Sequence, residues 1–391
     1  MGAPEKSRKY RILLVVRWPV GGIRTWLRYI YAQLDPSRYE LMIVLPGYDE
    51  FPALEEDLKV HNPEYIPLPP GYKPRDFLRE VFRVARTRNV DLIHSHGLTS
   101  ALYSSAAALI TNTPHLLTLH DVFTDGQFVG MKGYLKRLVV ACVMRAPDRI
   151  HCVSHDVYSN LLEYIASMRG HISKLVVIPN GIEIERFQKR ERRDLHTELN
   201  LPDHSFLLGF FGRFMSQKGF KYLIDALELL MKDPEIKRKP VVIACGNGGY
   251  IREERDRVSQ KGLSKHVVFL PFTPDVAPIM RGVDVVVMPS LWEACPLVAM
   301  EALVAGVPVV GTDCIGLREV LRDTPSTMVR AADSEALAQA LREEIIAPSR
   351  EKAKAFAAEA GLRFDGRPRF RQLESLIAEL ASRGTMAAAP E

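Results

Sequence analysis

The feature that most limits the fold is a repeated alternation between short apolar runs rich in β-branched residues and longer amphipathic stretches. Ten runs are predicted as strands, at residues 11–16, 40–45, 90–96, 115–121 and 149–154 and, in a second series, 206–212, 240–246, 266–272, 283–290 and 307–313. Continuous apolar strands separated by helices are typical of parallel sheets covered on both faces. Two series therefore predict an α/β chain with two doubly wound, Rossmann-like domains.

The two series are separated by VVIPNGIEIERF (176–187), where Pro, Asn and Gly interrupt the apolar pattern. The chain of 391 residues is also too long for one ordinary hydrophobic core. We therefore predict an N-terminal domain at residues 1–182 and a C-terminal domain at residues 183–364. The stretch RFRQLESLIAEL (369–380) is predicted to be helical, and the end, GTMAAAPE (384–391), is predicted to be disordered.

Composition disfavours several classes of protein. No apolar run reaches the roughly 18 residues that a membrane span needs, and the N-terminus lacks the apolar segment of a secretory signal. The 5 cysteines are odd in number and have neither disulfide nor metal-ligand spacing. We therefore expect a cytoplasmic, reduced protein. No basic surface with interleaved aromatic residues is recognisable, so no nucleic-acid partner is expected.

The stretch GRFMSQKGF (212–220) follows a predicted strand and opens a predicted helix. Gly212 permits a tight exit from the strand, which brings Arg213 and Lys218 beside the helix N-terminus. Two cations together with oriented backbone N–H groups suit a diphosphate. The alternative is that both side chains are solvated surface cations.

The stretch DVVVMPSLWEACPLVAMEALVAGVPVVGTD (284–313) holds two acids, Glu293 and Glu301, in an otherwise apolar run. Pro296 suits the first position of a helix, so Glu293 is predicted on the preceding loop and Glu301 just over one turn inside. A carboxylate at position 301 can accept hydrogen bonds from the two hydroxyls of a ribose, and Glu293 can bind sugar hydroxyls. Alternatively, the helix dipole alone favours an acid near a helix start.

The loop CGNGG (245–249) ends another predicted strand, and Gly246 allows close approach of the backbone to a ligand. The loop does not match GxGxxG, which argues against a nicotinamide cofactor. No Asp-x-Asp pair follows a strand, so we expect neither a metal nor another cofactor. The charge of a diphosphate would then be offset by the two cations and a helix dipole.

Several of these motifs resemble one family. GRFMSQKG and VVVMPSLWEACPLVAMEALVAGVPVVGTD closely resemble the donor-site signature of the retaining GT-B glycosyltransferases, the family four group (glycosyl transferases group 1). VIPNGIEIERF is similar to the interdomain segment of that family, and VRWPVGGI, DLIHSHG, TLHD and CVSH resemble its N-terminal landmarks. The resemblance implies a GT-B fold, with two Rossmann-like domains facing across a cleft and a helix at residues 365–383 returning to the N-terminal domain.

The resemblance also implies roles for individual residues of the C-terminal domain in binding a nucleotide-diphosphate sugar. Arg213 and Lys218 would neutralise the diphosphate, and Glu301 would bind the ribose. Glu293 would contact the sugar. The backbone at Leu297 and Val298, at the start of the helix, would meet the diphosphate.

In the N-terminal domain, the resemblance implies that Gly22 lets a loop approach the reaction centre and that His120 faces the transferred sugar. It also implies transfer with retention at the anomeric carbon. Glycosidases retain through a carboxylate nucleophile, but Asp121 is the nearest candidate and it could equally cap the next helix. We favour attack from the leaving-group face, with the departing phosphate taking the proton of the acceptor.

The expected reaction is transfer of a sugar from a nucleotide-diphosphate sugar, expected to be a UDP-sugar, to a hydroxyl acceptor of a cell-surface polysaccharide, lipopolysaccharide or glycolipid. Two alternatives stay open. One is a nucleotide-sugar epimerase of the same fold, which would convert the donor without an acceptor. The other is a non-catalytic partner subunit that binds a nucleotide sugar without consuming it.

The positive charge is uneven, because residues 1–180 carry the whole net excess of +5. The arginines of the predicted helix at 75–90 line one face, at Arg75, Arg79, Arg83 and Arg86, and two smaller basic clusters lie at Arg24 and Arg28 and at Lys132, Lys136 and Arg137. These clusters suggest contact with an anionic membrane surface, and hence a peripheral position on the inner face of the cytoplasmic membrane. The alternative for each cluster is an ordinary solvated helix face.

Overall fold

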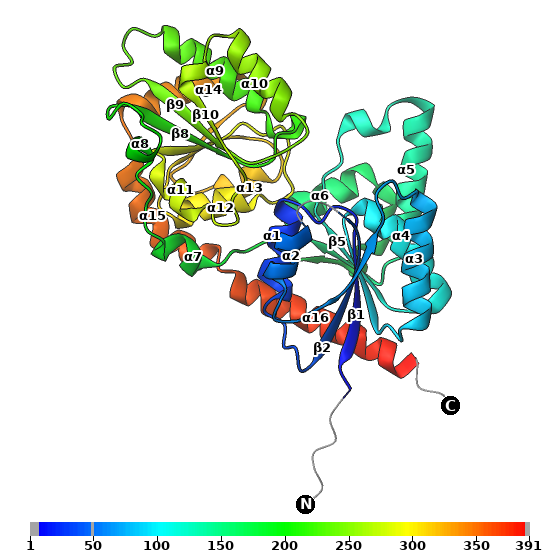
Figure 1. Cartoon of the computed structure of the whole chain (residues 1–391). Coiled ribbons are helices and arrows are strands. Elements are labelled where there is room, and N and C mark those ends of the chain that lie inside the picture. The colour runs from blue at the N-terminus through cyan, green and yellow to red at the C-terminus, as the bar shows by residue number, and fades with distance from the viewer. Residues whose placement is uncertain (1–7, 48–50, 388–391) are drawn as a thin grey trace, which may run out of the picture. The chain divides into compact units, whose positions relative to one another are not determined.

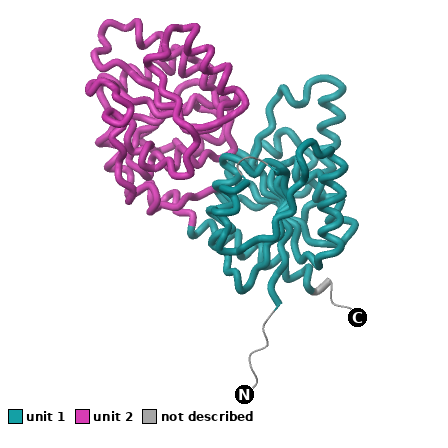
Figure 2. The backbone as a smooth tube through the Cα atoms, in the orientation of Figure 1, with its two compact units in different colours: residues 1–179, 367–391 teal, residues 180–366 magenta. Residues whose placement is uncertain are grey.

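The computed structural model describes residues 8–47 and 51–387 and divides the chain into two compact units. Unit 1 comprises residues 1–179 and 367–391, and unit 2 comprises residues 180–366 (Figure 2). The expected domain limits were 1–182 and 183–364.

Each unit contains a parallel sheet. The strands of unit 1 are β1 (Tyr10–Val16), β2 (Tyr39–Pro46), β3 (Glu64–Leu68), β4 (Leu92–His96), β5 (His115–Leu119), β6 (Arg149–Cys152) and β7 (Leu175–Val177). Those of unit 2 are β8 (Phe206–Phe211), β9 (Pro240–Cys245), β10 (Val267–Leu270), β11 (Val285–Met288), β12 (Val309–Thr312) and β13 (Thr327–Val329). The strand orders are β3-β2-β1-β4-β5-β6-β7 and β10-β9-β8-β11-β12-β13. Both follow the doubly wound pattern, in which the order reverses beside the first strand.

Helices connect the strands (Figure 1). In unit 1 they are α1 (Gly22–Tyr31), α2 (Phe51–Asp57), α3 (Pro74–Thr87), α4 (Leu98–Thr111), α5 (Gly130–Arg145), α6 (His155–Tyr164) and α16 (Gly366–Ala387), with 3-10 helices η1 (Asp125–Phe128) and η2 (Ala166–Lys174). In unit 2 they are α7 (Ile184–Lys189), α8 (Leu195–Glu198), α9 (Phe220–Lys232), α10 (Ile251–Gln260), α11 (Ala277–Gly282), α12 (Leu297–Val304), α13 (Leu317–Leu321), α14 (Ser334–Ile346) and α15 (Arg350–Arg363), with η3 (Ser216–Lys218) and η4 (Ser264–His266).

Alternation along β1 explains why unit 1 has a core on each face of its sheet. Ile12 and Leu14 belong to a cluster that includes residues of α1 and α16, while Leu13 and Val15 belong to one that includes residues of α3 and α4. Because both faces are covered, β1 is a continuous apolar run. The same physics makes all ten predicted strands recognisable, and all ten are confirmed.

Three strands escaped prediction: β3, β7 and β13. Each lies at the edge of its sheet, and β7 and β13 have only 3 residues. No residue of β7 or β13 is buried, and only Leu68 is buried in β3, which also contains Pro67. Edge strands of this kind lack the continuous apolar signal of a central strand.

The predicted helix at residues 75–90 is confirmed as α3. Its apolar face was expected at Phe77, Leu78, Val81, Phe82 and Ala85. Phe77, Val81 and Ala85 are buried, as is Val84, whereas Leu78 is exposed. The buried face is therefore centred on the 77, 81, 84 and 85 positions, which agrees with helical spacing.

Helix α16 carries the chain back onto unit 1 (red in Figure 1). Phe370, Leu373, Ile377 and Leu380 are buried in the core cluster that contains β1 residues. The helix extends to Ala387, so the disorder expected from residue 384 is wrong for residues 384–387. The rest of that expected tail, 388–391, lies outside the described residues.

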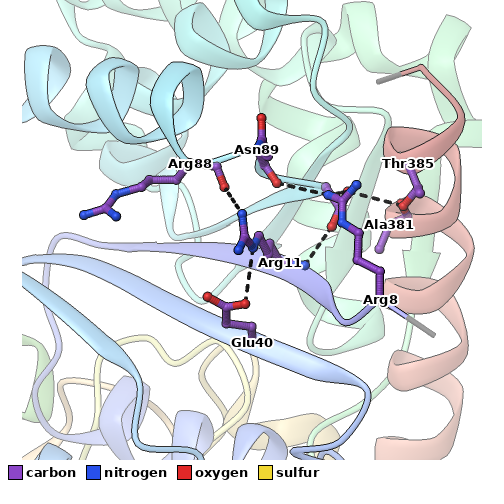
Figure 3. A network of polar contacts seen from close by, with 8 residues as sticks. Arg8, Arg11, Glu40, Arg88, Asn89, Ala381 and Thr385 are labelled. Carbon is purple, nitrogen blue, oxygen red and sulfur yellow. Dashed lines mark hydrogen bonds and ion pairs between the residues drawn. The ribbon is translucent and has the colours of Figure 1, made fainter. Parts of the chain in front are cut away.

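The end of α16 is attached to the sheet through Asp91, at the start of β4. The Asp91 carboxylate accepts hydrogen bonds from the Arg8 side chain and the Arg11 backbone, each at 2.8 Å, and from the Thr385 hydroxyl at 3.2 Å. Arg11 continues the network to Glu40 (Figure 3). A Cβ on Gly384 would lie 2.1 Å from the Asp91 carbonyl oxygen, so only glycine fits there.

One of the basic clusters of the N-terminal half is not a surface cluster. Arg24 is buried, and its Nε lies 3.1 Å from an Asp57 carboxylate oxygen. Arg28 lies 3.7 Å from the same carboxylate. This pair therefore holds α1 against α2, and the expectation that it faces a membrane is wrong. No helix within the described ranges is long and apolar enough to cross a membrane.

Candidate functional site

In unit 2, the candidate site lies where the strand order reverses. β8 is flanked by β9 on one side and by β11 on the other. Loops that leave neighbouring strands in opposite directions at such a point open a crevice at the carboxyl ends of the strands, where ligands bind in doubly wound folds. Here the two loops are residues 212–219, after β8, and residues 289–296, after β11.

Close backbone contacts hold these loops in place. Gly246 has a φ of 157°, and a Cβ on it would lie 1.9 Å from the Gly212 carbonyl oxygen. Gly316 has a φ of 77°, and a Cβ on it would lie 2.2 Å from the Glu293 carbonyl oxygen. Both positions therefore require glycine. The loops after β8, β9, β11 and β12 thus come together in one place.

Lys218 and Glu293 form an ion pair across the reversal point. The Lys218 Nζ donates to both Glu293 carboxylate oxygens, at 2.7 and 3.0 Å, and the Ser290 hydroxyl donates to one of them at 2.7 Å. Glu293 is only 5% exposed, whereas the Lys218 side chain is 23% exposed. The acid is therefore fully paired, and the ammonium keeps a solvent-facing side.

The loops that carry this pair are also tied through Gln217. Its side-chain amide donates to the Trp292 carbonyl at 2.8 Å, and its own carbonyl accepts from the Leu291 N–H at 2.8 Å. The two loops that carry the ion pair are thus hydrogen-bonded to each other beside it. Sequence reasoning gave the two residues separate roles and did not foresee that they pair with each other.

Glu301 lies on α12, the fifth residue of the helix, and is buried at 6% exposure. Pro296 is the N-cap rather than the first helical residue, so the helix starts at Leu297, one residue later than predicted. Leu297 and Val298 therefore lie in the first turn, whose backbone N–H groups have no acceptor within the helix. Arg213 follows Gly212 and is half-buried.

In unit 1, four histidines gather around Trp26 at the carboxyl side of β4, β5 and β6. Their rings lie 5.0 to 6.3 Å from the Trp26 ring, centroid to centroid, and they are His94, His96, His120 and His151. His96 Nδ1 lies 3.2 Å from His120 Nε2. We call these four residues the histidine cluster.

A chain of hydrogen bonds runs through the histidine cluster. His94 Nε2 lies 2.7 Å from the Thr118 hydroxyl, which lies 3.1 Å from His151 Nδ1. His151 Nε2 reaches the Ile178 carbonyl oxygen at 2.8 Å and must donate there. The Tyr31 hydroxyl is hydrogen-bonded to His94 Nδ1.

Burial keeps this cluster neutral. Desolvation holds the pKa of His94, His96 and His120 well below the usual value for histidine, and the neighbouring histidines lower it further. The pKa of His151 is lowered to about 4, also by desolvation. His120 is the partly exposed member. It therefore presents a neutral imidazole, which can donate or accept one hydrogen bond but carries no charge.

Two other expectations for unit 1 concern Gly22 and Asp121. Gly22 is the first residue of α1, and a Cβ on it would meet no atom within 4 Å. The left-handed conformation belongs instead to Gly21, at φ 58°. Burial raises the pKa of the Asp121 carboxyl, and the Leu98 backbone at the start of α4 partly opposes this.

Sequence reasoning singled out only His120 from the histidine cluster. The signal for two others was present, because His94 and His96 are two residues apart in a strand and therefore share a face. His151 occupies the register position beside Thr118 in the next strand. No group of three or more His, Cys, Asp or Glu among residues 8–47 and 51–387 is arranged to hold a metal ion.

Comparison with known proteins agrees with this architecture. The family model Glycosyltransferase Family 4 matches residues 20–186, and the model Glycosyl transferases group 1 matches residues 191–361. A D-inositol 3-phosphate glycosyltransferase of Corynebacterium jeikeium (strain K411) is 30% identical over 330 residues, which are 76% of this chain and 76% of that protein. The chain therefore belongs to the glycosyl transferases group 1, of the family four type, and is a glycosyltransferase.

Two further comparisons are informative. The structure of HepE of Anabaena in complex with UDP-glucose has a TM-score of 0.80 and 22% identity, covering 94% of this chain and 99% of that one, which shows the GT-B fold. An Escherichia coli enzyme named UDP-Gal:alpha-D-GlcNAc-diphosphoundecaprenol alpha-1,3-galactosyltransferase is 25% identical over 250 residues, 61% of this chain and 63% of that protein.

Proposed function

We propose that this glycosyltransferase moves a sugar from a nucleotide-diphosphate sugar, expected to be a UDP-sugar, to a hydroxyl acceptor, with retention and without a metal ion. The observation that carries the proposal is the meeting of Lys218, Glu293 and the start of α12 at the reversal point of unit 2. A cation, a sugar-binding acid and free helix N–H groups together suit a diphosphate sugar.

The proposed roles in unit 2 follow from charge and position. Arg213 and Lys218 offset the diphosphate, together with the N–H groups at Leu297 and Val298. Because Lys218 already pairs with Glu293, an incoming diphosphate shares the ammonium and leaves carboxylate oxygens of Glu293 available to sugar hydroxyls. Glu301 binds the ribose hydroxyls.

In the proposed reaction, the acceptor oxygen bonds to the anomeric carbon on the face from which the bond to the phosphate oxygen breaks. The departing phosphate takes the acceptor proton, which balances the charge that develops on it. His120 orients the sugar as a neutral hydrogen-bonding group. Gly22 stays assigned to the loop that approaches the reaction centre, as the family resemblance implies.

The proposed acceptor is a hydroxyl of a cell-surface polysaccharide, lipopolysaccharide or glycolipid. The Escherichia coli relative supports this choice, because its name specifies a UDP-sugar donor and a diphosphoundecaprenol-linked acceptor. The complex of HepE with UDP-glucose supports the choice of uridine. The epimerase and the non-catalytic subunit are the alternatives, and each predicts that no sugar reaches an acceptor.

A calorimetric titration with a panel of UDP-, GDP- and ADP-sugars tests the donor site. One class of donor should bind the wild-type protein, and Glu301→Ala should weaken that binding by about tenfold or more, because a bidentate hydrogen-bonding partner of the ribose is lost. Glu359→Gln, at an exposed acid of α15, is the matched control and should bind as the wild type does. Equal binding by Glu301→Ala and the wild type would refute the assignment.

Contact with an anionic membrane through α3 stays a prediction. Arg75, Arg79, Arg83 and Arg86 are all exposed. However, Arg83 is paired with Glu80 at 2.6 Å and Arg75 lies 3.9 Å from Asp76, so acids on the same helix offset part of the charge. The face of α3 that carries these arginines is polar, with Leu78 as its one exposed large apolar residue within the described chain.

A further inference from the structure

Helix α5 exposes an unusual amount of apolar surface. Six residues spaced as i, i+3, i+4, i+7, i+8 and i+11 form a single stripe along it, and all six are exposed. The members of this α5 stripe are Met131 (74% exposed), Tyr134 (57%), Leu135 (55%), Leu138 (47%), Val139 (53%) and Cys142. Val129, just before the helix, is 72% exposed.

The opposite side of α5 is also apolar and faces the unit. Gly133, Val140, Val143 and Met144 are buried there. The helix is beside α4 in unit 1 (Figure 1). A helix that is apolar on both sides is normally buried on both sides. Here one side packs on the unit and the other, the α5 stripe, is left uncovered.

Cations flank the α5 stripe without compensating acids. The sequence GMKGYLKRLVVACVMR contains four basic residues and no acidic one. By helical position, Lys132 and Lys136 lie on one side of the stripe and Arg137 on the other. The Lys136 ammonium and the Arg137 guanidinium both lie over the Phe128 ring, 5.6 and 4.9 Å from its centroid. Lys132, Lys136, Arg137 and Arg145 make no ion pair with any acid in the described part of the chain. The helix thus combines exposed apolar and uncompensated positive surface.

We propose that the α5 stripe docks on a bilayer surface of anionic phospholipids, with the stripe entering the headgroup boundary and the flanking cations contacting phosphates. An apolar face bordered by Lys and Arg is the pattern of helices that lie in such an interface. Tyr134 suits it too, because its ring is apolar and its hydroxyl is polar.

A second copy of the chain fits the α5 stripe less well. A symmetric contact would place the same patch against itself, so the four cations would face four cations with no acid on the helix to offset them. Like charges brought together across an interface oppose association. An anionic bilayer instead meets both the apolar and the positive parts of the surface.

Docking through α5 extends the proposed function, because it would bring the enzyme to a lipid-linked acceptor. The test nevertheless needs neither sugar donor nor acceptor. Co-sedimentation with phosphatidylglycerol-containing vesicles and with neutral phosphatidylcholine vesicles measures docking alone. A failure of docking therefore leaves the proposed transfer standing, and a failure of transfer leaves docking standing.

The informative variant is Leu135→Glu with Leu138→Glu, which places two acids in the exposed stripe and leaves the buried side intact. We expect the wild type to bind anionic vesicles, to bind neutral vesicles less, and to be released by salt. The double variant should bind anionic vesicles at least about tenfold more weakly, because two apolar side chains are lost from the interface. Circular dichroism and thermal unfolding check that it is folded.

The matched control is Leu229→Glu with Ile346→Glu, at apolar residues of unit 2 that are 42% and 53% exposed. It adds the same charge and should bind vesicles as the wild type does. Equal binding by the α5 variant and this control would overturn the proposal. So would a wild-type protein that ignores anionic vesicles but forms a dimer, seen by analytical ultracentrifugation, that the α5 variant abolishes.

Discussion

At the residue scale, the proposed donor site contains a buried carboxylate, that of Glu293. Glu293 receives two hydrogen bonds from Lys218 and one from Ser290, in a loop fixed by backbone contact with Gly316. A buried carboxylate needs hydrogen-bond partners in place of water, and these three bonds hold the Glu293 side chain in one position. Its partner Lys218 retains a solvent-facing side and is therefore free to take a second anion.

The pairing itself can be tested by a double-mutant cycle. Lys218→Met leaves Glu293 buried with Ser290 alone, so the free energy of unfolding should fall by about 1–3 kcal/mol. Adding Glu293→Gln should restore part of that loss, because the remaining side chain is neutral. Urea unfolding followed by the fluorescence of Trp292, the one tryptophan of unit 2, is a suitable measurement.

The control for this cycle is Lys232→Met. Lys232 lies 2.7 Å from Glu228, the same distance as in the Lys218–Glu293 pair, but the Lys232 side chain is 67% exposed. Solvent-exposed pairs contribute little to stability. Lys232→Met should therefore change the unfolding curve far less than Lys218→Met. Similar losses in both variants would contradict the view that burial gives the Lys218–Glu293 pair its effect.

At the element scale, the central strands carry the strongest sequence signal. Strands such as β1 and β8 are buried on both faces, and their apolar runs identify them directly. The edge strands β7 and β13 have no buried residue and were missed. The outward face of α5 could not be predicted for the opposite reason. The helix is apolar on both sides, and only the packing shows which side is uncovered.

The candidate site was predictable in part. The glycines and charged residues after the strands pointed to the carboxyl edge of unit 2, where Lys218, Glu293 and Gly246 do lie. The ion pair between Lys218 and Glu293 could not be deduced from the sequence. It depends on how closely the loops after β8 and β11 approach each other in the fold. In unit 1, the sequence shows that His94 and His96 lie on the same face of a strand. The grouping of four histidines around Trp26, however, depends on the register of the sheet.

The histidine cluster of β4, β5 and β6 predicts a pH dependence for unit 1. Burial lowers the pKa of these histidines in the folded state, so the unfolded chain binds protons first as the pH falls below the ordinary value of about 6.5. The stabilisation that comes from keeping these histidines neutral is therefore fully present above that pH and is lost as the pH falls below it. The free energy of unfolding should fall by at least about 1.4 kcal/mol per pH unit between roughly pH 6 and roughly pH 5.

Thermal unfolding from about pH 7 to about pH 5 measures this dependence. His96→Phe keeps an aromatic ring beside Trp26 but removes one titrating group, so its melting temperature should fall less steeply with pH. His204→Gln, at an exposed histidine of unit 2, should leave the slope unchanged. A melting temperature that is flat over this range in the wild type would show that the cluster does not stay neutral.

At the scale of the whole molecule, the chain forms two doubly wound units, each with its own cluster of candidate functional residues. Unit 2 holds the features proposed to bind a diphosphate, at its strand-reversal point, and unit 1 holds the neutral histidine cluster. α16 belongs to unit 1 although it follows unit 2 in the sequence, and its end is attached at Asp91. Assembly of unit 1 therefore requires both ends of the chain, so a truncation before α16 removes part of its core.

The proposed activity of the chain is transfer of sugar from a nucleotide-diphosphate donor to a hydroxyl acceptor. The most direct measurement is release of nucleoside diphosphate from the donor that binds in the calorimetric panel, with and without a lipid-linked saccharide acceptor, in buffer containing EDTA. We expect release that depends on the acceptor and survives EDTA, and a product that keeps the anomeric configuration of the donor by NMR. Conversion of the donor without acceptor, inversion of the anomeric configuration, or no release from a donor that demonstrably binds would contradict the proposed retaining transfer.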